Sequence, residues 1–505
     1  MNLEYVIIQA GGKGTRLDYL TKNKPKALVP INNLPMIFHC FKKFQDKKFI
    51  IIGDYKCDVL RNYLDTFADV KYIVIDAKGA KGTCGGLNKA LDILPAKAAF
   101  LLIWSDLVLP ETFSFPDKIE NYIGISKDFE CRWSYNNGKF QEIPSKEHGV
   151  AGFFAFKEKR YLKGIPEEGE FVRWLQTNDI HFNEINLYKT KEYGLLSEYN
   201  KLQIERCRPF NKVVISGDRF IKEGIDNQGK RLAVQEKAWY KYVQKKGFGS
   251  IPRIYSYEPF EMEYIQGKNV FEYDFDLETK REILNKIVKM LHNLHSLEKG
   301  STDYFSIWNN YYTKTFERLN KIQNLVPFAQ NPLICINGKK CRNIFFYKNE
   351  IRNFIEKYRI DNFSLIHGDC TFSNMMLNQN HDPILIDPRG YFGFTSMLGD
   401  ENYDWAKLYY SLVGDYDKFN IKKFKLVIDE EDESVELHIE SSNWKSLESY
   451  FFEILGDSVS KKNIKMIHAI IWLSLTTYAW EDYDSICGAF YNGLLYFEEA
   501  LNELS

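Results

Sequence analysis

The sequence has no long hydrophobic run and no excess of charge of either sign. Its 505 residues include 67 Lys and Arg against 68 Asp and Glu, a net charge of −1. Without a basic field, we expect no binding to nucleic acid or to an anionic membrane surface. The most hydrophobic stretch, residues 464–475, contains Lys465 and His468. It is also shorter than the roughly 18 residues that a membrane span needs, so no membrane insertion is expected.

Glycine and proline are scarce, and the cysteines form no pattern. There are 31 Gly and 15 Pro, which excludes collagen-like sequence and long flexible linkers. The nine Cys form no CxxC pair, so neither a zinc site nor a disulfide framework is expected. The N-terminal residues MNLEYVIIQAGGKG lack the cationic segment and cleavage site of a signal peptide. We therefore expect a soluble cytoplasmic protein, and the sequence is compatible with an oligomer.

The pattern of apolar residues predicts two domains of different construction. Residues 1–110 alternate strands (5–9, 49–52, 72–75, 100–104) with helices (36–44, 58–67, 86–94), which predicts a parallel, Rossmann-like α/β sheet. Further on, residues 213–216 and 219–223 predict a hairpin, and helical periodicity follows at 233–244, 277–297, 308–324, 349–358 and in the last sixty residues. An acidic hairpin is predicted at 424–439. We place the domains at residues 1–205 and 206–505.

A glycine-rich loop follows the first predicted strand. Gly11, Gly12 and Gly14 in AGGKGTRL would let backbone N–H groups approach phosphate oxygens, although a tight strand-to-helix turn explains the glycines alone equally well. Arg16 and the nearby Lys24-Pro25-Lys26 favour the phosphate interpretation, because fixed cations neutralise a triphosphate under attack. Asp106 ends another strand, where a carboxylate is well placed to hold Mg²⁺ or simply to cap a turn.

Together these motifs resemble the sugar-nucleotidyltransferase family, which has a glycosyltransferase-A-like fold. The matching segments are AGGKGTRL, KPKALVPINNLPMI and KGTCGGL. The resemblance implies Arg16 and Lys26 as catalytic residues and Asp106 as a metal ligand. It implies a nucleotide site formed by Gly11, Gly12, Gly14, Thr15, Gly82, Thr83 and Gly85.

The second half of that family's pattern is less well preserved. Gly152 in HGVAGFFAF resembles the substrate-contacting glycine, and KEYGLLSEY resembles the segment with the second metal ligand, which becomes Glu192 instead of the usual Asp. The phosphate-anchoring lysine is missing from residues 142–144, and Lys146 is the candidate substitute.

A second set of polar residues lies in LIHGDCTFSNMML and the following LIDPRG. Asp369 follows a short apolar strand, Asn374 comes five residues later, and Asp387 ends the next strand. This spacing is typical of phosphoryl transfer, in which the first Asp orients the substrate hydroxyl and the other two residues hold Mg²⁺.

The second set resembles the aminoglycoside phosphotransferase and choline kinase family, which has a two-lobed, protein-kinase-like α+β fold. The resemblance implies Asp369 as catalytic base, Asn374 and Asp387 as metal ligands, and His367 as an orienting residue. It also implies that Asp404 hydrogen-bonds the catalytic loop. The ATP-binding residues implied are Lys222 with its partner Glu236, and Glu263 and Ile265 in the interlobe hinge.

Two such domains imply consecutive steps on one small alcohol. The kinase half would phosphorylate it with ATP, and the other half would couple the phosphomonoester to an NTP, with CTP favoured, to give a precursor of surface polysaccharide. Arg389, near the expected acceptor site, favours a sugar or polyol over choline or ethanolamine, because it would repel an ammonium group. CDP-choline synthesis and a non-catalytic domain remain alternatives, whereas antibiotic resistance would leave the N-terminal half unexplained. The C-terminal aromatic residues could form a cage for a quaternary amine, but core packing is favoured.

Overall fold

The computed structural model describes residues 3–118, 120–202, 211–225 and 227–504, except for the side chains of residues 211, 228 and 504. The chain divides into two compact units. One comprises Met1–Ile204 with Trp480–Asp484, and the other comprises Glu205–Ala479 with Ser485–Ser505. The expected domain boundary between residues 205 and 206 lies outside the described residues.

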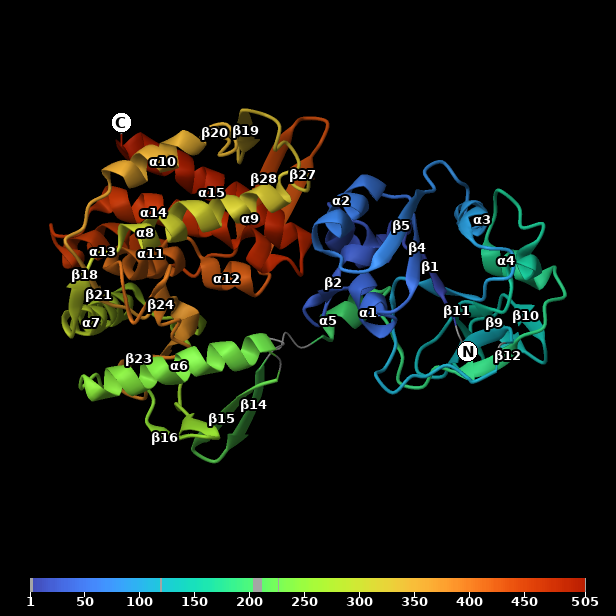
Figure 1. Ribbon diagram of the computed structural model, residues 1–505, viewed down its shortest axis with the longest axis horizontal. Helices are drawn as coiled ribbons and strands as arrows, with labels where there is room; N and C mark the ends of the chain where they lie inside the picture. The colour runs from blue at the N-terminus through green and yellow to red at the C-terminus, as the bar shows by residue number, and fades with distance from the viewer. Residues whose placement is uncertain (1–2, 119, 203–210, 226, 505) are drawn as a thin grey trace. The chain divides into compact units, whose positions relative to one another are not determined.

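A nine-stranded mixed sheet forms the framework of the first unit. Its parallel part has the order β6-β1-β4-β5, which corresponds to Phe100–Trp104, Tyr5–Gln9, Lys48–Gly53 and Lys71–Asp76. The crossover helices are α1 (Met36–Lys43), α2 (Cys57–Phe67) and α3 (Thr83–Ile93) (Figure 1). The predicted strands and helices of this region are confirmed to within three residues at each end. β1, β4 and β6 are apolar almost throughout because both faces of the sheet are buried.

Antiparallel strands extend this sheet beyond β6. β11 (Gly149–Phe156) pairs with β6 and with β8 (Tyr122–Ser126), and β12 (Asn183–Asn186) runs parallel to β8. A separate short pair joins β7 (Leu107–Val108) to β13 (Lys191–Glu192) and places Glu192 opposite Leu107. This pairing brings the segment around Glu192 to the end of β6, where Asp106 lies.

The second unit begins with a small antiparallel sheet of order β14-β15-β17-β16. The strands are Asn211–Ser216, Arg219–Gly224, Phe260–Glu263 and Ile254–Tyr257. The predicted hairpin is confirmed, with Ser216 opposite Arg219 and Gly217 in the left-handed region at φ 63°. Helix α6 (Asn227–Lys245) runs along this sheet (Figure 1).

The rest of the second unit is mostly helical. Its main helices are α7 (Leu277–Ser296), α8 (Tyr304–Trp308), α9 (Lys314–Ile322), α10 (Lys348–Lys357), α11 (Glu401–Leu412), α13 (Glu448–Leu455), α14 (Lys461–Leu475) and α15 (Tyr483–Leu504). The helix predicted at 308–324 is interrupted, because a π-helix at Asn309–Thr313 joins α8 to α9. The predicted acidic hairpin, β27 (Phe424–Asp429) and β28 (Ser434–Ile439), is present, but β28 also pairs with β19 (Leu333–Ile336).

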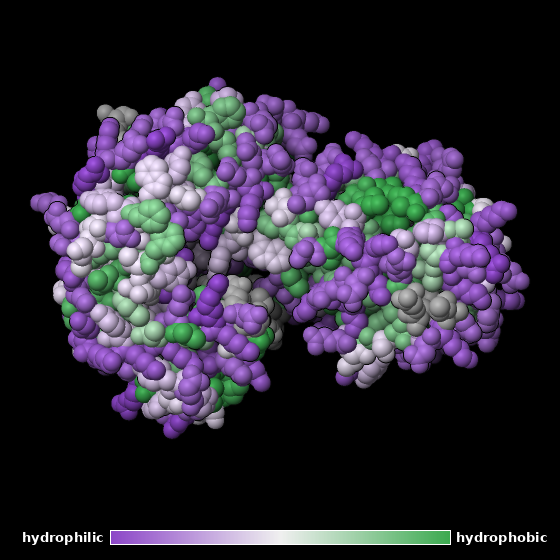
Figure 2. Space-filling view, viewed as in Figure 1, coloured by the Kyte–Doolittle hydropathy of each residue, from purple (hydrophilic) through white to green (hydrophobic). Residues whose placement is uncertain are grey.

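The surface in view is predominantly hydrophilic (Figure 2). A hydrophobic patch lies over the edge strand β5, where Ile73 is 50% exposed. Within the described part of the chain, no helix is both long enough and apolar enough to cross a bilayer.

Candidate active sites

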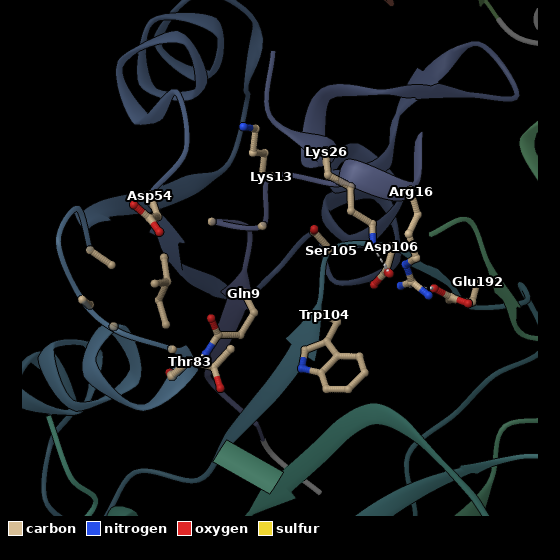
Figure 3. Close-up of a pocket in the computed structure, with 17 residues that line it drawn as sticks. Gln9, Lys13, Arg16, Lys26, Asp54, Thr83, Trp104, Ser105, Asp106 and Glu192 are labelled. Atoms are coloured by element: carbon tan, nitrogen blue, oxygen red, sulfur yellow. Dashed lines mark hydrogen bonds and ion pairs between the residues drawn. The ribbon is translucent and has the colours of Figure 1, made fainter. Parts of the chain in front are cut away.

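A pocket of about 430 Å³ opens at the carboxyl ends of the parallel strands in the first unit (Figure 3). β1 and β6 run in register, with Gln9 opposite Trp104, so the loops that follow them begin at the same sheet edge. The residues that line the pocket are Gln9, Gly11, Gly12, Lys13, Arg16, Lys26, Ile52, Asp54, Ala77, Ala80, Gly82, Thr83, Gly86, Trp104, Ser105, Asp106 and Glu192.

The glycine-rich loop has a packing reason as well as a possible binding role. A Cβ atom on Gly11 would lie 2.8 Å from Asp54 Cβ and 3.1 Å from the Asp54 backbone nitrogen. Gly12 has no heavy atom within 4 Å of its Cβ position, and Gly14 adopts φ 67° against the side chain of Lys26. The loop is therefore held close to the end of β4, with its middle glycine facing open space.

Two cations and two carboxylates lie together at one end of the pocket (Figure 3). The Nζ atom of Lys26 donates to Oδ2 of Asp106, and Nη2 of Arg16 lies 4.0 Å from Oε1 of Glu192. The backbone N–H of Tyr193 donates to the Asp106 carbonyl at 3.1 Å, which fixes the position of β13. The structure thus brings together four side chains that the sequence singled out.

The two carboxylates have opposite pKa shifts. Burial by itself would raise the pKa of Asp106, but the adjacent Lys26 ammonium outweighs it and lowers the pKa. Burial and the charge of Asp106 raise the pKa of Glu192 to about 7. At neutral pH, the Glu192 carboxyl is therefore partly protonated, and a divalent cation bound by the two carboxylates can displace that proton. Mg²⁺ is commonly held by one or two carboxylates together with substrate phosphates, so this pair fits it.

Of the other residues predicted for the first site, some line the pocket and others do not. Gly82 and Thr83 line the pocket at the start of α3. A Cβ on Gly85 would lie 2.2 Å from the Glu167 carbonyl, so this glycine serves helix packing and lies outside the pocket lining. Gly152, at φ 76°, makes room for the lining residue Trp104, whose ring atoms would lie 2.1 Å from a Cβ. Gly152 is also outside the lining, as are Thr15, Gly14 and the exposed Lys146.

Sequence analysis missed several residues that line this pocket. Gln9, Trp104 and Ser105 end or follow parallel strands, so the carboxyl-edge rule could have found them. Lys13 lies within the glycine motif itself. Lys24, by contrast, does not line the pocket, because it is buried and ion-paired at 3.0 Å with Asp482 of the same unit.

In the second unit, Asp404 of α11 holds the predicted catalytic loop. Its Oδ2 accepts from the backbone N–H of His367 at 2.9 Å, and its Oδ1 accepts from that of Gly368 at 2.8 Å. The Nε2 atom of His295 lies 3.1 Å from Oδ2. The His367 ring is buried, with Nε2 3.0 Å from the Ile386 carbonyl. These contacts agree with an orienting role for His367 and with the role expected of Asp404.

The three residues of the phosphoryl-transfer motif lie around this loop. Asn374 Nδ2 donates to the Asp369 carbonyl at 2.8 Å and to Asp369 Oδ2 at 3.1 Å, which leaves Asn374 Oδ1 as the oxygen suited to a metal. Asp387 adopts φ 53°, and its Oδ1 lies 2.5 Å from Nζ of Lys222. The Lys222 ammonium also lies 2.8 Å from Glu236 Oε2, as the sequence predicted for this pair.

The charges around Lys222 keep it protonated. Burial lowers its pKa, but the carboxylates of Asp387 and Glu236 more than offset this effect, so the pKa of Lys222 lies above its ordinary value. At the hinge, the Glu263 N–H donates to the Arg253 carbonyl at 2.8 Å, so this amide is not available to adenine. Ile265 is buried.

Lys407 is the main residue of this site that the sequence analysis missed. It lies on α11, three residues after Asp404, and its Nζ lies 2.9 Å from Oδ1 of Asp369. Helical spacing places Asp404 and Lys407 on one face, so this lysine could have been found once Asp404 was assigned. The aromatic residues that were candidates for an amine cage are mainly core: Trp472, Phe490 and Tyr491 are fully buried.

Two family models match the chain. The nucleotidyl transferase family matches residues 5–127, and the phosphotransferase enzyme family matches residues 225–419. The D-glycero-α-D-manno-heptose 1-phosphate guanylyltransferase of Campylobacter jejuni is 30% identical over 228 residues, which cover 43% of this chain and 94% of that protein. The N-terminal half of the chain therefore belongs to the nucleotidyltransferase family, and the whole chain is a fusion with a kinase-like phosphotransferase domain. It is an enzyme with nucleotidyltransferase and phosphotransferase activities.

Solved structures also resemble the chain over its N-terminal part. HddC from Yersinia pseudotuberculosis, in complex with GMP-PN, has a TM-score of 0.34 at 19% identity and covers 39% of this chain and 97% of its own. The CTP:phosphocholine cytidylyltransferase from Streptococcus pneumoniae has a TM-score of 0.33 at 20% identity and covers 40% of this chain and 97% of its own.

Proposed function

We propose that the two halves catalyse consecutive steps on one small alcohol, a sugar or a polyol. The phosphotransferase half transfers the γ-phosphoryl group of ATP to a hydroxyl group and releases ADP. The nucleotidyltransferase half then joins the phosphomonoester to the α-phosphorus of CTP and releases pyrophosphate. The product is an activated precursor for surface polysaccharide. The observation that carries this proposal is the presence of two separate phosphate-handling sets of residues on one chain.

In the nucleotidyltransferase half, the glycine loop and Arg16 bind the triphosphate. Lys26, which contacts Asp106, stabilises the negative charge that develops at the α-phosphorus as the phosphomonoester oxygen attacks. Mg²⁺, held by Asp106 and Glu192 in this half and by Asn374 and Asp387 in the other, would neutralise phosphate charge. Each of these residues acts as the resemblance to the family implies.

In the phosphotransferase half, Asp369 orients the acceptor hydroxyl and takes its proton. The new bond joins the acceptor oxygen to the γ-phosphorus, while the bond from that phosphorus to the β,γ-bridging oxygen breaks. Lys222, fixed between Glu236 and Asp387, binds the phosphates of ATP. Asp404 holds the loop that carries Asp369 in place, so it is a positioning residue.

A choline or ethanolamine kinase coupled to a cytidylyltransferase is the alternative assignment. The surroundings of Arg389 do not favour it. Of the acids that follow it in sequence, Asp400 accepts hydrogen bonds from Tyr311 and Tyr358, and Glu401 is paired with Lys299. The guanidinium of Arg389 is therefore not neutralised by either acid, and it would repel an ammonium group.

The base of the nucleotide has two candidates. The sequence analysis favours CTP, whereas the C. jejuni relative is named a guanylyltransferase, which supports GTP. Parallel reactions with equal concentrations of CTP, GTP, UTP and dTTP discriminate between them, because only the accepted nucleotide yields pyrophosphate.

³¹P NMR of the full-length protein tests both steps in one tube. With ATP, Mg²⁺, the accepted nucleotide and a panel of sugars, alditols, sugar acids, choline and ethanolamine, we expect a phosphomonoester signal first. Signals of a diphosphate diester and of pyrophosphate should follow. Without ATP, the alcohol should remain unphosphorylated and neither product should form. Addition of the phosphomonoester should then restore the second reaction. A protein that forms no phosphomonoester from any of these acceptors would contradict the proposal.

A further inference from the structure

Four cationic side chains lie around the predicted catalytic base of the phosphotransferase half. Lys314 and Arg318 are one turn apart on α9, Lys407 is on α11, and Arg389 follows Asp387 by two residues. All four side chains belong to half-buried residues. We call them the basic cluster.

The basic cluster contacts Asp369 through Lys407. The Lys407 ammonium lies 2.9 Å from Asp369 Oδ1 and 5.9 Å from the centre of the Tyr403 ring. Nη1 of Arg389 lies 3.2 Å from the hydroxyl of the same Tyr403. The charges of Arg389, Arg318 and Lys407 all act on Lys314 and, after burial, lower its pKa well below the ordinary value. Lys314 is therefore the member of the basic cluster that gains most from a nearby negative charge, which would favour its protonated form.

Carboxylates do not balance this charge. Among the described residues, Lys407 is the one member of the basic cluster with an ion pair. Lys314 donates to Asn310 Oδ1, while Nη1 of Arg318 donates to the Ser474 carbonyl at 2.6 Å. Arg389 contacts the Tyr403 hydroxyl and stacks 4.4 Å from the centre of the Tyr391 ring. Four basic side chains therefore share one carboxylate, that of Asp369.

Uncompensated cations in a partly desolvated site are costly unless an anion binds beside them. A second feature points to a missing ligand. Asn310 is 5% exposed, and its Nδ2 donor has no hydrogen-bond partner within the part of the chain that the structure describes. It lies in the π-helix Asn309–Thr313, a distortion that is frequent at functional sites. A bound anion could accept from this donor and from the cations together.

We propose that the basic cluster binds an anionic group of the acceptor, a carboxylate or a phosphate, so that the phosphotransferase half phosphorylates an acidic hydroxy compound. This inference rests on the kinase step of the proposed function and names the class of its substrate. It narrows the sugars and polyols of the proposed function to compounds that also carry an acidic group. Neither choline nor a neutral polyol has a negative charge to balance the basic cluster. If Arg389 and Lys407 bind the anionic group of the acceptor, the acceptor hydroxyl lies near Asp369, with which it must react.

Calorimetry with the full-length protein and MgADP measures binding directly, without turnover. The probes are matched pairs: D-glycerate against glycerol, and D-gluconate against D-glucitol. Glycerol 3-phosphate separates a preference for phosphate from one for carboxylate, and choline is the cationic probe. Because hydrogen bonds to charged groups are the stronger kind, we expect the best anion to bind about 10- to 100-fold more tightly than its neutral partner.

Two variants test which residues bind the anion. Arg318→Gln and Lys314→Met should each weaken binding of the best anion about tenfold or more, with little change in the dissociation constant of MgADP. Lys321→Met is the matched control, because Lys321 is exposed on the same helix α9. Circular dichroism checks folding, and the second variant keeps the inference testable if the first does not fold.

Equal binding of acids and neutral partners, or no binding of any anion, would overturn the inference. It would also be overturned if the variants weakened MgADP binding and left anion binding unchanged, because the cluster would then serve the nucleotide. ATP-dependent phosphorylation of the same probes is measured separately. Tight, variant-sensitive anion binding without phosphorylation of any probe would support the basic cluster and contradict the proposed kinase step.

Discussion

Substitution of Asp404 by Asn should loosen the loop that carries Asp369 without removing a reacting group. Asp404 is fully buried and accepts the N–H groups of His367 and Gly368 at 2.9 and 2.8 Å, directly before Asp369. An asparagine side chain has nearly the same shape. It keeps one acceptor oxygen but turns an N–H donor toward one of the two backbone N–H groups.

The size of the effect on loop stability and on the rate can be estimated from these hydrogen bonds. A hydrogen bond to a charged group contributes about 1.5–3 kcal/mol, and a buried donor left without a partner costs about 1–3 kcal/mol. We expect Asp404→Asn to destabilise the ordered loop by about 2–4 kcal/mol, which is roughly 30- to 700-fold in its opening equilibrium. Displacement of a catalytic group by about 1 Å costs on the order of 10² in rate, so kinase kcat/KM should fall about 10- to 100-fold.

Hydrogen exchange of residues 366–370 reports the loop, and ADP release reports the kinase step. Pyrophosphate release from a supplied phosphomonoester serves as a folding control and should not change. Asp400→Asn is the matched control variant, because Asp400 is an equally buried acid that caps the same helix. Its partners include the hydroxyls of Tyr311 and Tyr358, which can donate or accept, so an asparagine can keep these hydrogen bonds. Residues 366–370 should therefore remain protected from hydrogen exchange in this variant.

The pH dependence gives an independent check. Burial would raise the pKa of Asp404, but the hydrogen bond from His295 and the contacts with His367 outweigh it and lower the pKa. The charged form therefore stabilises the loop above the unfolded pKa of about 3.9, and this contribution is lost as pH falls through the lower folded value. The difference between native protein and variant should shrink below about pH 4. If the variant kept native exchange rates and kinase activity at neutral pH, the role assigned to Asp404 would be refuted.

Three further predictions concern the reacting groups. Asp369→Asn should abolish ATP-dependent phosphorylation and leave coupling of a supplied phosphomonoester intact, whereas loss of both activities in a folded protein would contradict the independence of the two halves. Lys26→Ala should lower kcat of nucleotidyl transfer by about 10²–10³ with kinase turnover unchanged, and a near-normal kcat would assign Lys26 to surface solvation. Since the pKa of Glu192 is about 7, Mg²⁺ must displace a proton at lower pH. The Mg²⁺ concentration for half-maximal nucleotidyl transfer should then rise about tenfold per pH unit below 7, and Glu192→Gln should remove this slope; a requirement that does not change with pH would count against Glu192 as a ligand.

The sequence alone was sufficient to predict the features that depend on short local patterns of residues. Apolar strands followed by glycines or by a carboxylate identified the edge at which Arg16, Lys26 and Asp106 meet, because parallel strands place their carboxyl ends together. The spacing of Asp369 and Asn374 likewise predicted two residues that contact each other in the structure, and the predicted pairing of Lys222 with Glu236 is present. Both families were recognised from such short motifs, and the matches to family models confirm them.

Contacts between distant segments were decided only by the tertiary structure. Gly85 looked like a nucleotide contact because it lies in a glycine motif, yet its Cβ position is occupied by the Glu167 carbonyl of another loop. Arg389 was singled out from the sequence, whereas Lys314 and Arg318 of α9 were not, although the charges of Arg389 and Arg318 both act on Lys314 in the folded chain. Helical periodicity specifies the face on which a residue lies and not which other element that face meets, since packing depends on the whole chain. The charge around Asp369, on which the proposed class of acceptor rests, therefore depends on the fold.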